Sequence, residues 1–564
     1  MIPNHAVKLV EGPDDAAPRD LGYQHVTVED REIETAKGYR RIAFAVIHSA
    51  DLCKALRLHI RTTNLFRTPA EVPLSLLVSK VFQLRELGDR LAEVQGFSQL
   101  IGLLEAAAAE EIDQVRGMTA EGKVDYSHLH LLFKAEQEVA IGEGSELRGG
   151  RVVGHEYASD IWGGERFEVT ITYLMSDGRR LVYENMTAKI PYFNGVVDTS
   201  ELPIRVLAKA EKASLQSRGE KYVKIAIGPT YAQYSGTLVR KSWWSSNQYK
   251  ANGRVMIDRT SMARMEPDYF RAYRGNNDCD DDKSVATQES YWMCDKTLYG
   301  FSFAAKMWGE MDLDMLLPVV FDEAAFDMLV LAPDLKEQIL ALVEGAGSSF
   351  SDVITGKGGG CIFCLHGEPG TGKTLTAEAV AEVLKRPLYS ISIGELGTVP
   401  DELEKRLRTI LDMASTWNAV VLLDEADIFL EKRDENNIVR NAMVGIFLRL
   451  LEYHQGVLFL TTNRVRNFDP AFVSRISIAL HYGRMTSETR EKVWANLLHA
   501  AGIKGIDPGE MSAHDINGRQ IKNSIRLAQS LARKKGEAVG IPHLNSVIST
   551  AAKFASDLER HQVI

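Results

Sequence analysis

Short apolar runs occur through the C-terminal half of the chain, separated by longer segments with helical periodicity. The runs at residues 361–365, 419–424 and 456–460 are too short for helices, and their apolar residues are consecutive. Such runs are typical of parallel strands that are buried on both faces. Residues 375–385 follow the first run and carry apolar side chains at helical spacing. The pattern therefore predicts an α/β domain built on a parallel sheet.

The N-terminal half has a different pattern. Residues 71–117 are rich in Leu, Ala and Glu with few breakers, which favours helices. Farther along, the alternating segments 167–173 and 180–183 flank a Ser-Asp-Gly turn, as in a β-hairpin. Further strands are expected at residues 222–227 and 253–258. This half is thus predicted to be an α+β region that is helical first and β-rich later.

Composition narrows the class of protein. A chain of 564 residues with 45% hydrophobic and 25% charged residues is ordinary for a soluble protein of several domains. The formal net charge of −10 argues against broad binding to nucleic acid or anionic membranes. We see no export signal and no apolar run near the roughly 18 residues that a membrane span needs. We therefore expect a cytoplasmic or nuclear protein without a transmembrane segment.

The five cysteines are an odd number in a long chain, which favours reduced thiols. Cys361 and Cys364 have the spacing of half a zinc site or of a redox pair. On a strand, however, positions three apart point to opposite faces. We therefore interpret both side chains as buried strand thiols.

The segment His366–Thr374 reads HGEPGTGKT and follows the first apolar run. This is the pattern of a phosphate-binding loop, in which glycines let backbone N–H groups turn inward around phosphates. Lys373 would reach the β- and γ-phosphates, and the Thr374 hydroxyl would bind Mg²⁺. The loop opens onto the predicted helix, whose N-terminus favours phosphate. We expect ATP to contact Gly367, Glu368, Pro369, Gly370, Thr371, Gly372, Lys373, Thr374 and Leu375.

Two further strand ends carry polar side chains. Asp424 and Glu425 end the second apolar run, and Asn463 follows the third. Ligands of open parallel sheets lie beyond the carboxyl ends of the strands, so Asp424 would meet the same Mg²⁺ as Thr374. Glu425 would orient and deprotonate the attacking water, and Asn463 would hold that water. The expected catalytic set therefore includes Lys373, Glu425 and Asn463.

Together with the segments 468–476 and 517–522, these motifs resemble those of AAA+ ATPases, in the expected order over residues 352–530. The resemblance implies a P-loop αβα core with a five-stranded parallel sheet and a small C-terminal helical lid. It places the strands at residues 361–365, 387–393, 419–424, 456–461 and 476–482. The implied domains are residues 1–125 (mostly helical), 126–320 (β-rich, of unknown function, with a connector), 321–484 (ATPase core) and 485–564 (lid).

The resemblance also implies roles for single residues. Asn463 corresponds to sensor 1, Arg519 to sensor 2 on the lid, and Arg475 to an arginine finger for the neighbouring subunit. Ile354 and Gly356 stand where the family contacts adenine. A finger given in trans implies a homo-oligomeric ring, a hexamer by family resemblance. An ordinary surface ion pair is the alternative for Arg475, since the usual pair of arginines is reduced to one.

Two segments differ from protein-threading members of the family. Residues 392–398 lack the aromatic side chain that grips polypeptide, although Leu396 remains able to contact a substrate. Residues 431–437 are charged and fit either a second pore loop or a solvated loop. Short pieces of the N-terminal half, among them residues 253–258 and 300–309, resemble a domain of uncharacterised function found on a subgroup of AAA ATPases.

The resulting functional prediction is ATP binding and Mg²⁺-dependent ATP hydrolysis by an oligomer. Hydrolysis would drive remodelling of a protein partner engaged by the N-terminal domain. The alternative is a nucleotide-gated signalling or scaffolding switch that hydrolyses ATP slowly. The expected cofactors are ATP and Mg²⁺, and no nucleic-acid binding is expected.

Overall fold

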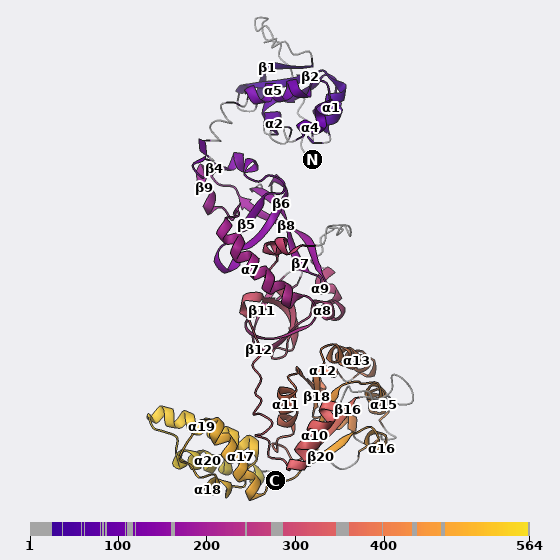
Figure 1. The fold of residues 1–564 in the computed structure, drawn as a ribbon, viewed down its shortest axis with the longest axis vertical. Helices are drawn as coiled ribbons and strands as arrows, with labels where there is room; N and C mark the ends of the chain where they lie inside the picture. Colours follow the sequence, from indigo (N-terminus) through magenta and orange to yellow (C-terminus); the bar gives the residue numbers. More distant parts are fainter. Residues whose placement is uncertain are drawn as a thin grey trace. The chain divides into compact units, whose positions relative to one another are not determined.

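The computed structural model describes residues 25–561 except for short gaps. The gaps are residues 36–37, 58, 61, 79, 82–83, 85–86, 108, 110–116, 119, 160–163, 243–244, 272–285, 346–359, 398, 431, 433–436 and 464–467. The chain divides into two compact units, residues 1–173 with 184–215 and residues 174–183 with 216–564 (Figure 1). Within the described residues, no helix combines the length and apolar character needed to cross a membrane.

The first unit begins with an antiparallel sheet packed against helices. Its strands, in spatial order, are β1 (Val26–Thr35), β2 (Gly38–Ile47) and β3 (Ala70–Pro73). The main helices are α1 (Ala50–Arg57), α2 (Leu74–Val78), α4 (Gly88–Leu91) and α5 (Phe97–Ala107). Ala45, Leu52 and Leu100 are fully buried in the core between sheet and helices. The region predicted to be mostly helical therefore also contains a sheet that sequence reasoning missed.

The β-rich part of the first unit centres on a five-stranded sheet. In spatial order its strands are β10 (Ile204–Val206), β5 (Glu138–Ile141), β6 (Arg148–Ser159), β7 (Glu165–Ser176) and β8 (Leu181–Pro191). A separate two-stranded sheet pairs β4 (Lys123–Asp125) with β9 (Val196–Asp198). The predicted hairpin corresponds to β7 and β8, and the Asp177 carboxylate accepts from the backbone N–H of Arg180 in the turn.

One predicted strand is wrong. Residues 222–226 form the last turns of helix α7 (Lys209–Ala226) and not a strand. Leu215, Tyr222 and Ala226 are buried at spacings of seven and four, which is one face of a helix. The local alternation of apolar residues is thus overridden by a helical face that begins farther upstream.

In the second unit, a small closed sheet precedes the α/β domain. Strand β12 pairs with β13, β13 with β14, β14 with β11, and β11 again with β12, so the sheet closes into a barrel. The bounds are β11 (Thr230–Lys241), β12 (Ser246–Ile257), β13 (Thr297–Ser302) and β14 (Met307–Asp312), with β15 (Leu316–Leu317) added beside β11. Helices α8 (Arg259–Met265) and α9 (Pro267–Arg271) follow β12. The strand predicted at 253–258 is the end of β12.

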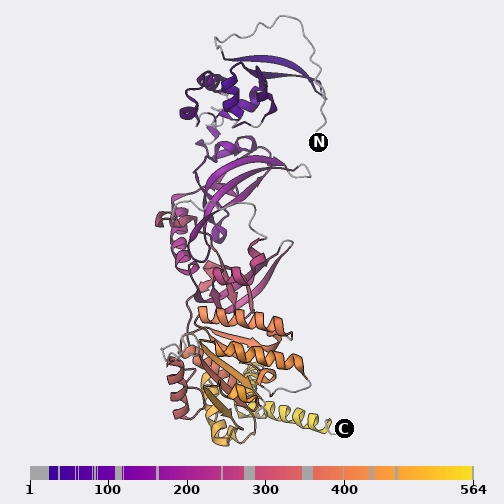
Figure 2. The same ribbon diagram turned by 90° about the vertical axis from the view of Figure 1, so that its right-hand side faces the viewer.

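The α/β domain has the predicted five-stranded parallel sheet. Its spatial order is β17 (Leu388–Ser392), β18 (Val420–Asp424), β19 (Val457–Thr462), β16 (Cys361–Gly367) and β20 (Ile478–Tyr482). One face packs on α10 (Pro333–Gly345) and α11 (Lys373–Val383), and the other on α13 (Pro400–Thr416) and α15 (Ile438–Glu452) (Figure 2). The αβα core is confirmed.

A helical bundle follows the core. It consists of α17 (Ser487–Ala500), α18 (Pro508–Ser512), α19 (Gly518–Lys535) and α20 (Ile541–His561) (Figure 1). Trp494, Ile521 and Leu544 are fully buried where three of these helices meet. This bundle corresponds to the predicted lid.

The barrel and the α/β core share a buried aromatic cluster within the second unit. Phe301 of β13 stacks on Tyr389 of β17 with ring centroids 5.4 Å apart, and Trp308 of β14 lies 5.8 Å from Trp417. The Trp417 indole N–H donates to the Asp258 carboxylate at 2.8 Å. The segments at 253–258 and 300–309 are therefore barrel segments that lie against the ATPase core.

Candidate nucleotide site

The phosphate-binding loop joins β16 to α11 through backbone conformations that require glycine. Gly367 has φ of 138°, and a Cβ there would lie 2.0 Å from the carbonyl oxygen of Tyr482. Gly372 has φ of 103° and is the N-cap of α11. The Thr371 hydroxyl donates to the carbonyl of Glu368 at 2.8 Å and closes the loop on itself. A compact turn therefore leads directly into a helix N-terminus, the arrangement that binds phosphate.

Lys373 lies under this loop and is only 7% exposed. Its Nζ donates to the carbonyl oxygens of Gly367 at 2.9 Å and Glu368 at 2.7 Å. Burial lowers the pKa of Lys373, and the carboxylates of Asp424 and Asp427 oppose that shift. A largely desolvated ammonium of this kind interacts strongly with a polyanion.

The two expected metal ligands lie side by side. Asp424 ends β18, and the Thr374 hydroxyl in the first turn of α11 is 3.4 Å from its Oδ2. Carboxylate and hydroxyl oxygens are the ligand type that Mg²⁺ takes from proteins, so the pair fits the expected ion. Leu375, the next residue of the helix, is 49% exposed.

The expected base, Glu425, has an unusual backbone. Its φ is 56°, a left-handed conformation that non-glycine residues rarely adopt. The backbone N–H of Glu425 donates to the Thr461 hydroxyl at 3.0 Å, and that of Ala426 donates to the Thr461 carbonyl at 2.8 Å. Glu425 is exposed and follows Asp424 directly at the end of β18. Residues held in such conformations cluster at active sites.

Asn463 stands at the end of β19 and is exposed. Its backbone N–H donates to Asp427 Oδ1 at 3.2 Å. The hydroxyls of Thr461 and Thr462 also contact the acidic loop, and sequence reasoning assigned no role to either threonine. The available signal was a pair of hydroxyl residues at a strand end that neighbours the strand carrying the acids.

The lid reaches the phosphate-binding loop through the start of α19. The Asn517 Nδ2 is 3.5 Å from the carbonyl oxygen of Pro369, and a Cβ on Gly370 would lie 2.7 Å from the Asn517 side chain. Arg519 is exposed in the first turn of this helix. The structure therefore brings the expected sensor 2 segment to the loop. Ile354 and Gly356, the expected adenine contacts, lie outside the described residues.

Arg475 follows the short helix α16 (Pro470–Val473). Its Nη1 donates to the carbonyl of Ala471 at 2.6 Å, and its Nη2 forms an ion pair with Glu452 at 3.2 Å. The guanidinium is partly buried, with the side chain 29% exposed. The contact with Glu452 is the ion pair that the sequence analysis kept as an alternative.

The expected pore segments give one correction. Leu396 ends the short helix α12 (Ile393–Leu396) and is fully buried in the core, so it does not offer a surface to a substrate. Leu396 points inward because α12 packs against β17 at the edge of the parallel sheet. Most of the segment 431–437 lies outside the described residues.

The cysteine prediction holds for Cys361 and Cys364, which are both buried and free. Burial raises the pKa of the Cys364 thiol to about 11, so it stays protonated. Among the described residues, no group of three or more His, Cys, Asp or Glu side chains is arranged to hold a metal ion. The two cysteines of the CxxC spacing are thus buried thiols of β16.

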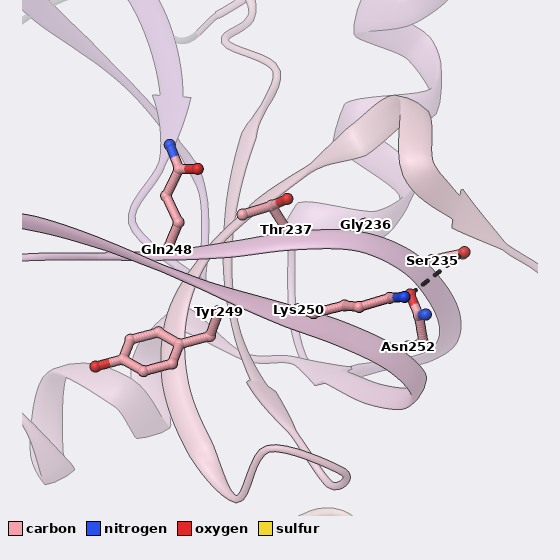
Figure 3. Close-up of a pocket in the computed structure, with 7 residues that line it drawn as sticks. All are labelled: Ser235, Gly236, Thr237, Gln248, Tyr249, Lys250 and Asn252. Atoms are coloured by element: carbon pink, nitrogen blue, oxygen red, sulfur yellow. Dashed lines mark hydrogen bonds between the residues drawn. The ribbon is translucent and has the colours of Figure 1, made fainter.

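A separate concavity of about 590 Å³ lies on the hairpin formed by β11 and β12 (Figure 3). Most of its lining side chains carry a polar group, and the Ser235 hydroxyl contacts the Asn252 amide oxygen at 3.5 Å. The lining residues are Ser235, Gly236, Thr237, Gln248, Tyr249, Lys250 and Asn252. This set contains no carboxylate to act as a base, so the candidate chemistry stays with the phosphate-binding loop.

Comparisons with known proteins agree with this geometry. The family model described as ATPase family associated with various cellular activities (AAA) matches residues 363–484. A model described as a domain of unknown function, DUF7025, matches residues 114–210. The first match covers the loop, both acids and Arg475.

Curated relatives match over part of their length. A mitochondrial Lon protease homolog of Candida dubliniensis is 28% identical over 247 residues, 40% of this chain and 21% of that protein. The human ATPase family AAA domain-containing protein 3B is 33% identical over 181 residues, 30% of this chain and 28% of that protein. The mitochondrial sorting homolog of Caenorhabditis elegans is 25% identical over 229 residues, 39% of this chain and 66% of that protein. The chain thus spans less than two thirds of each relative.

The glycine loop on a buried lysine, the acids at the neighbouring strand end and the family match all lead to one assignment. Residues 363–484 are similar to the AAA ATPase family and carry its ATP-binding P-loop features, and residues 114–210, which precede them, are similar to DUF7025.

Proposed function

We propose that this chain is a Mg²⁺-dependent ATP hydrolase that acts as a homo-oligomeric ring. The observation that supports this most is the convergence of Lys373, Thr374, Asp424 and Glu425 at the carboxyl end of one parallel sheet. In open α/β sheets this edge is where ligands bind. ATP would lie in the loop of residues 367–375, with Ile354 and Gly356 contacting adenine and Arg519 of the lid contacting phosphate.

The chain's own residues divide the hydrolytic step between them. Lys373 binds the β- and γ-phosphates, and Thr374 with Asp424 holds the metal. Mg²⁺, when bound, neutralises the charge that develops on the phosphate oxygens. Glu425 takes a proton from the attacking water, and Asn463 orients that water. Arg475 of a neighbouring subunit completes the site by stabilising the transition-state charge.

We propose that lid movement relative to the core is passed to the N-terminal region, which engages and remodels a protein partner. The slowly hydrolysing switch remains the second candidate. It is favoured by residues 392–397, which have no aromatic side chain and whose leucine is buried.

Phosphate release with size measurement in ATP and ADP tests both candidates. Glu425→Gln should bind ATP normally and lower kcat by about 10²–10⁴-fold, the usual contribution of a general base. Lys373→Ala should instead weaken ATP binding. Turnover of Glu425→Gln at the wild-type rate would refute the assigned base, and a wild-type ring that does not hydrolyse would favour the switch.

The cellular compartment is a separate part of the proposal. The cytoplasmic or nuclear location expected from sequence stays a prediction, and two of the relatives named above are described as mitochondrial. Imaging of the tagged full-length chain decides between these compartments.

A further inference from the structure

Thr461 connects both acidic residues of the site through one hydroxyl group. It lies at the end of β19, beside the end of β18, and is 2% exposed. Its Oγ1 donates to Asp424 Oδ1 and accepts from the Glu425 backbone N–H at 3.0 Å. Both hydrogen-bonding capacities of the hydroxyl are therefore used within the acidic loop.

The Thr461 hydroxyl is a polar group on a strand whose preceding residues are apolar. Residues Val457–Leu460 are apolar and buried, so a valine at position 461 would match the rest of β19. Packing alone does not require oxygen here. The polar atom instead satisfies a carboxylate that is expected to bind metal and a backbone N–H beside the expected base.

The backbone conformation of Glu425 is a second observation that involves Thr461. Its left-handed φ of 56° is held from both sides by Thr461, through the hydroxyl to Glu425 and through the carbonyl to Ala426. The direction in which the Glu425 side chain leaves the loop is set by this backbone conformation. One residue therefore fixes both the metal ligand and the base.

Thr462 makes a separate contact. Successive side chains of a strand point to opposite faces, and the Thr462 hydroxyl donates to Asp427, which also accepts from the Asn463 N–H. Thr461 acts on Asp424 and Glu425, whereas Thr462 acts on Asp427. Substitution of Thr461 thus leaves the Asn463 contact in place.

We propose that Thr461 is a positioning residue for ATP hydrolysis, which orients Asp424 toward Mg²⁺ and Glu425 toward the attacking water. The inference rests on the proposed hydrolase function. Partners that orient metal ligands typically contribute 10–100-fold to metal affinity or activity. Thr461 is buried and bonded to the acidic loop, so its loss should act on kcat and Mg²⁺ binding more than on the KM for ATP.

The test compares Thr461→Val, which keeps the shape, with Thr461→Ser, which keeps the hydroxyl. Thr461→Val should lower kcat by about 10–100-fold and raise the Mg²⁺ concentration for half-maximal binding of a fluorescent ATP analogue by about 3–10-fold. At saturating Mg²⁺ its KM for ATP should change less than about threefold, because the contacts of the phosphate-binding loop with ATP are retained. Thr461→Ser should stay within about threefold of wild type in all three.

Thr416→Val is the matched control, because Thr416 is exposed on α13 and its hydroxyl donates to the carbonyl of Asp412 in the same helix. It should behave as wild type. If the Thr461→Val variant does not fold, Thr461→Ala, which also lacks the hydroxyl, takes its place. Wild-type Mg²⁺ dependence in the variants without hydroxyl, or equal losses in Thr461→Ser, would overturn the role of Thr461. The binding readout is independent of turnover, so failure of hydrolysis in the wild type counts only against the proposed function.

Discussion

The nucleotide half of the site and the arginine half differ in how their residues are held. Lys373, Asp424 and Glu425 are bonded to the loop or to β19 within one chain, at the edge where ATP is expected. Arg475 is bonded to Glu452 and Ala471. The first half is organised by its own fold. If Arg475 acts on a neighbouring subunit as proposed, the second half must exchange its internal partner Glu452 for the nucleotide of that subunit.

This difference makes assembly the expected control point for turnover. A site whose polar groups are preorganised gains little from further ordering, whereas a held guanidinium must first leave its carboxylate. Substitutions of Arg475 and Glu452 should therefore change how the ATPase rate depends on assembly. Substitution of Glu425 should lower the rate without changing that dependence.

The largest expected effect is that of Arg475→Ala. Loss of an arginine finger lowers hydrolysis by about 10³–10⁵-fold. ATP affinity should be nearly unchanged, because the P-loop half is intact. Phosphate release at saturating ATP measures the loss.

Mixing two inactive variants sharpens this prediction. Arg475→Ala supplies an intact nucleotide half and Glu425→Gln supplies an intact arginine, so mixed rings should regain part of the wild-type rate. The matched control is Arg408→Ala, which removes an exposed guanidinium paired with Glu404 on α13. If Arg475→Ala hydrolyses ATP like that control, Arg475 is an ordinary ion pair and the comparison fails.

A smaller effect is expected for Glu452→Gln. Its ion pair with Arg475 is partly exposed, and such pairs contribute about 0–1 kcal/mol. Weakening the pair should therefore lower the protein concentration for half-maximal activity by about two- to fivefold. Glu488→Gln, which loses an exposed pair with Lys492 in the lid, is the control and should leave that concentration unchanged. A higher concentration requirement in Glu452→Gln would contradict the idea that Glu452 restrains the arginine.

The smallest effect on activity at neutral pH is expected at His454, two residues beyond Glu452. Burial lowers the pKa of His454 to about 4 from its ordinary value of 6.5, and the side chain is 5% exposed. The folded chain therefore resists protonation between those values while the unfolded chain accepts it. Stability should fall as the pH drops from about 6.5 to about 4, by up to about 1 kcal/mol per pH unit.

Urea unfolding at pH 7, 6 and 5 measures this slope. His454→Gln should reduce the dependence of the free energy of unfolding on pH. Phosphate release per folded molecule at neutral pH should not change, because His454 is not one of the proposed site residues. A slope identical to wild type would show that His454 does not set the acid sensitivity.

The nucleotide half was largely predictable from sequence. The loop from Gly367 to Thr374 and the acids after an apolar run are local patterns, and the parallel order of the strands follows from their alternation with helices. The contribution of Thr461 was not predictable, because it depends on which strand lies beside β18 in space. The roles assigned to the site residues remain predictions until the variants are measured.

At three other places the local sequence pattern was misleading, two of them in the N-terminal half. Residues 222–226 alternate like a strand yet continue a helix whose buried face includes Leu215. The sheet of β1 and β2 lies in a region judged by its helical composition. In the C-terminal half, Leu396 was expected to remain able to contact a substrate, but it is fully buried. In each case a tertiary contact outweighs the local signal.

The aromatic cluster between barrel and core determines where the chain can be divided into fragments. Phe301 and Trp308 cover Tyr389 and Trp417, so a fragment that begins between residues 309 and 361 would lack the first two rings and expose the other two. Uncovered apolar patches promote self-association. A fragment that begins ahead of residue 230 keeps all four rings, so the barrel should be retained whenever the α/β core is produced separately.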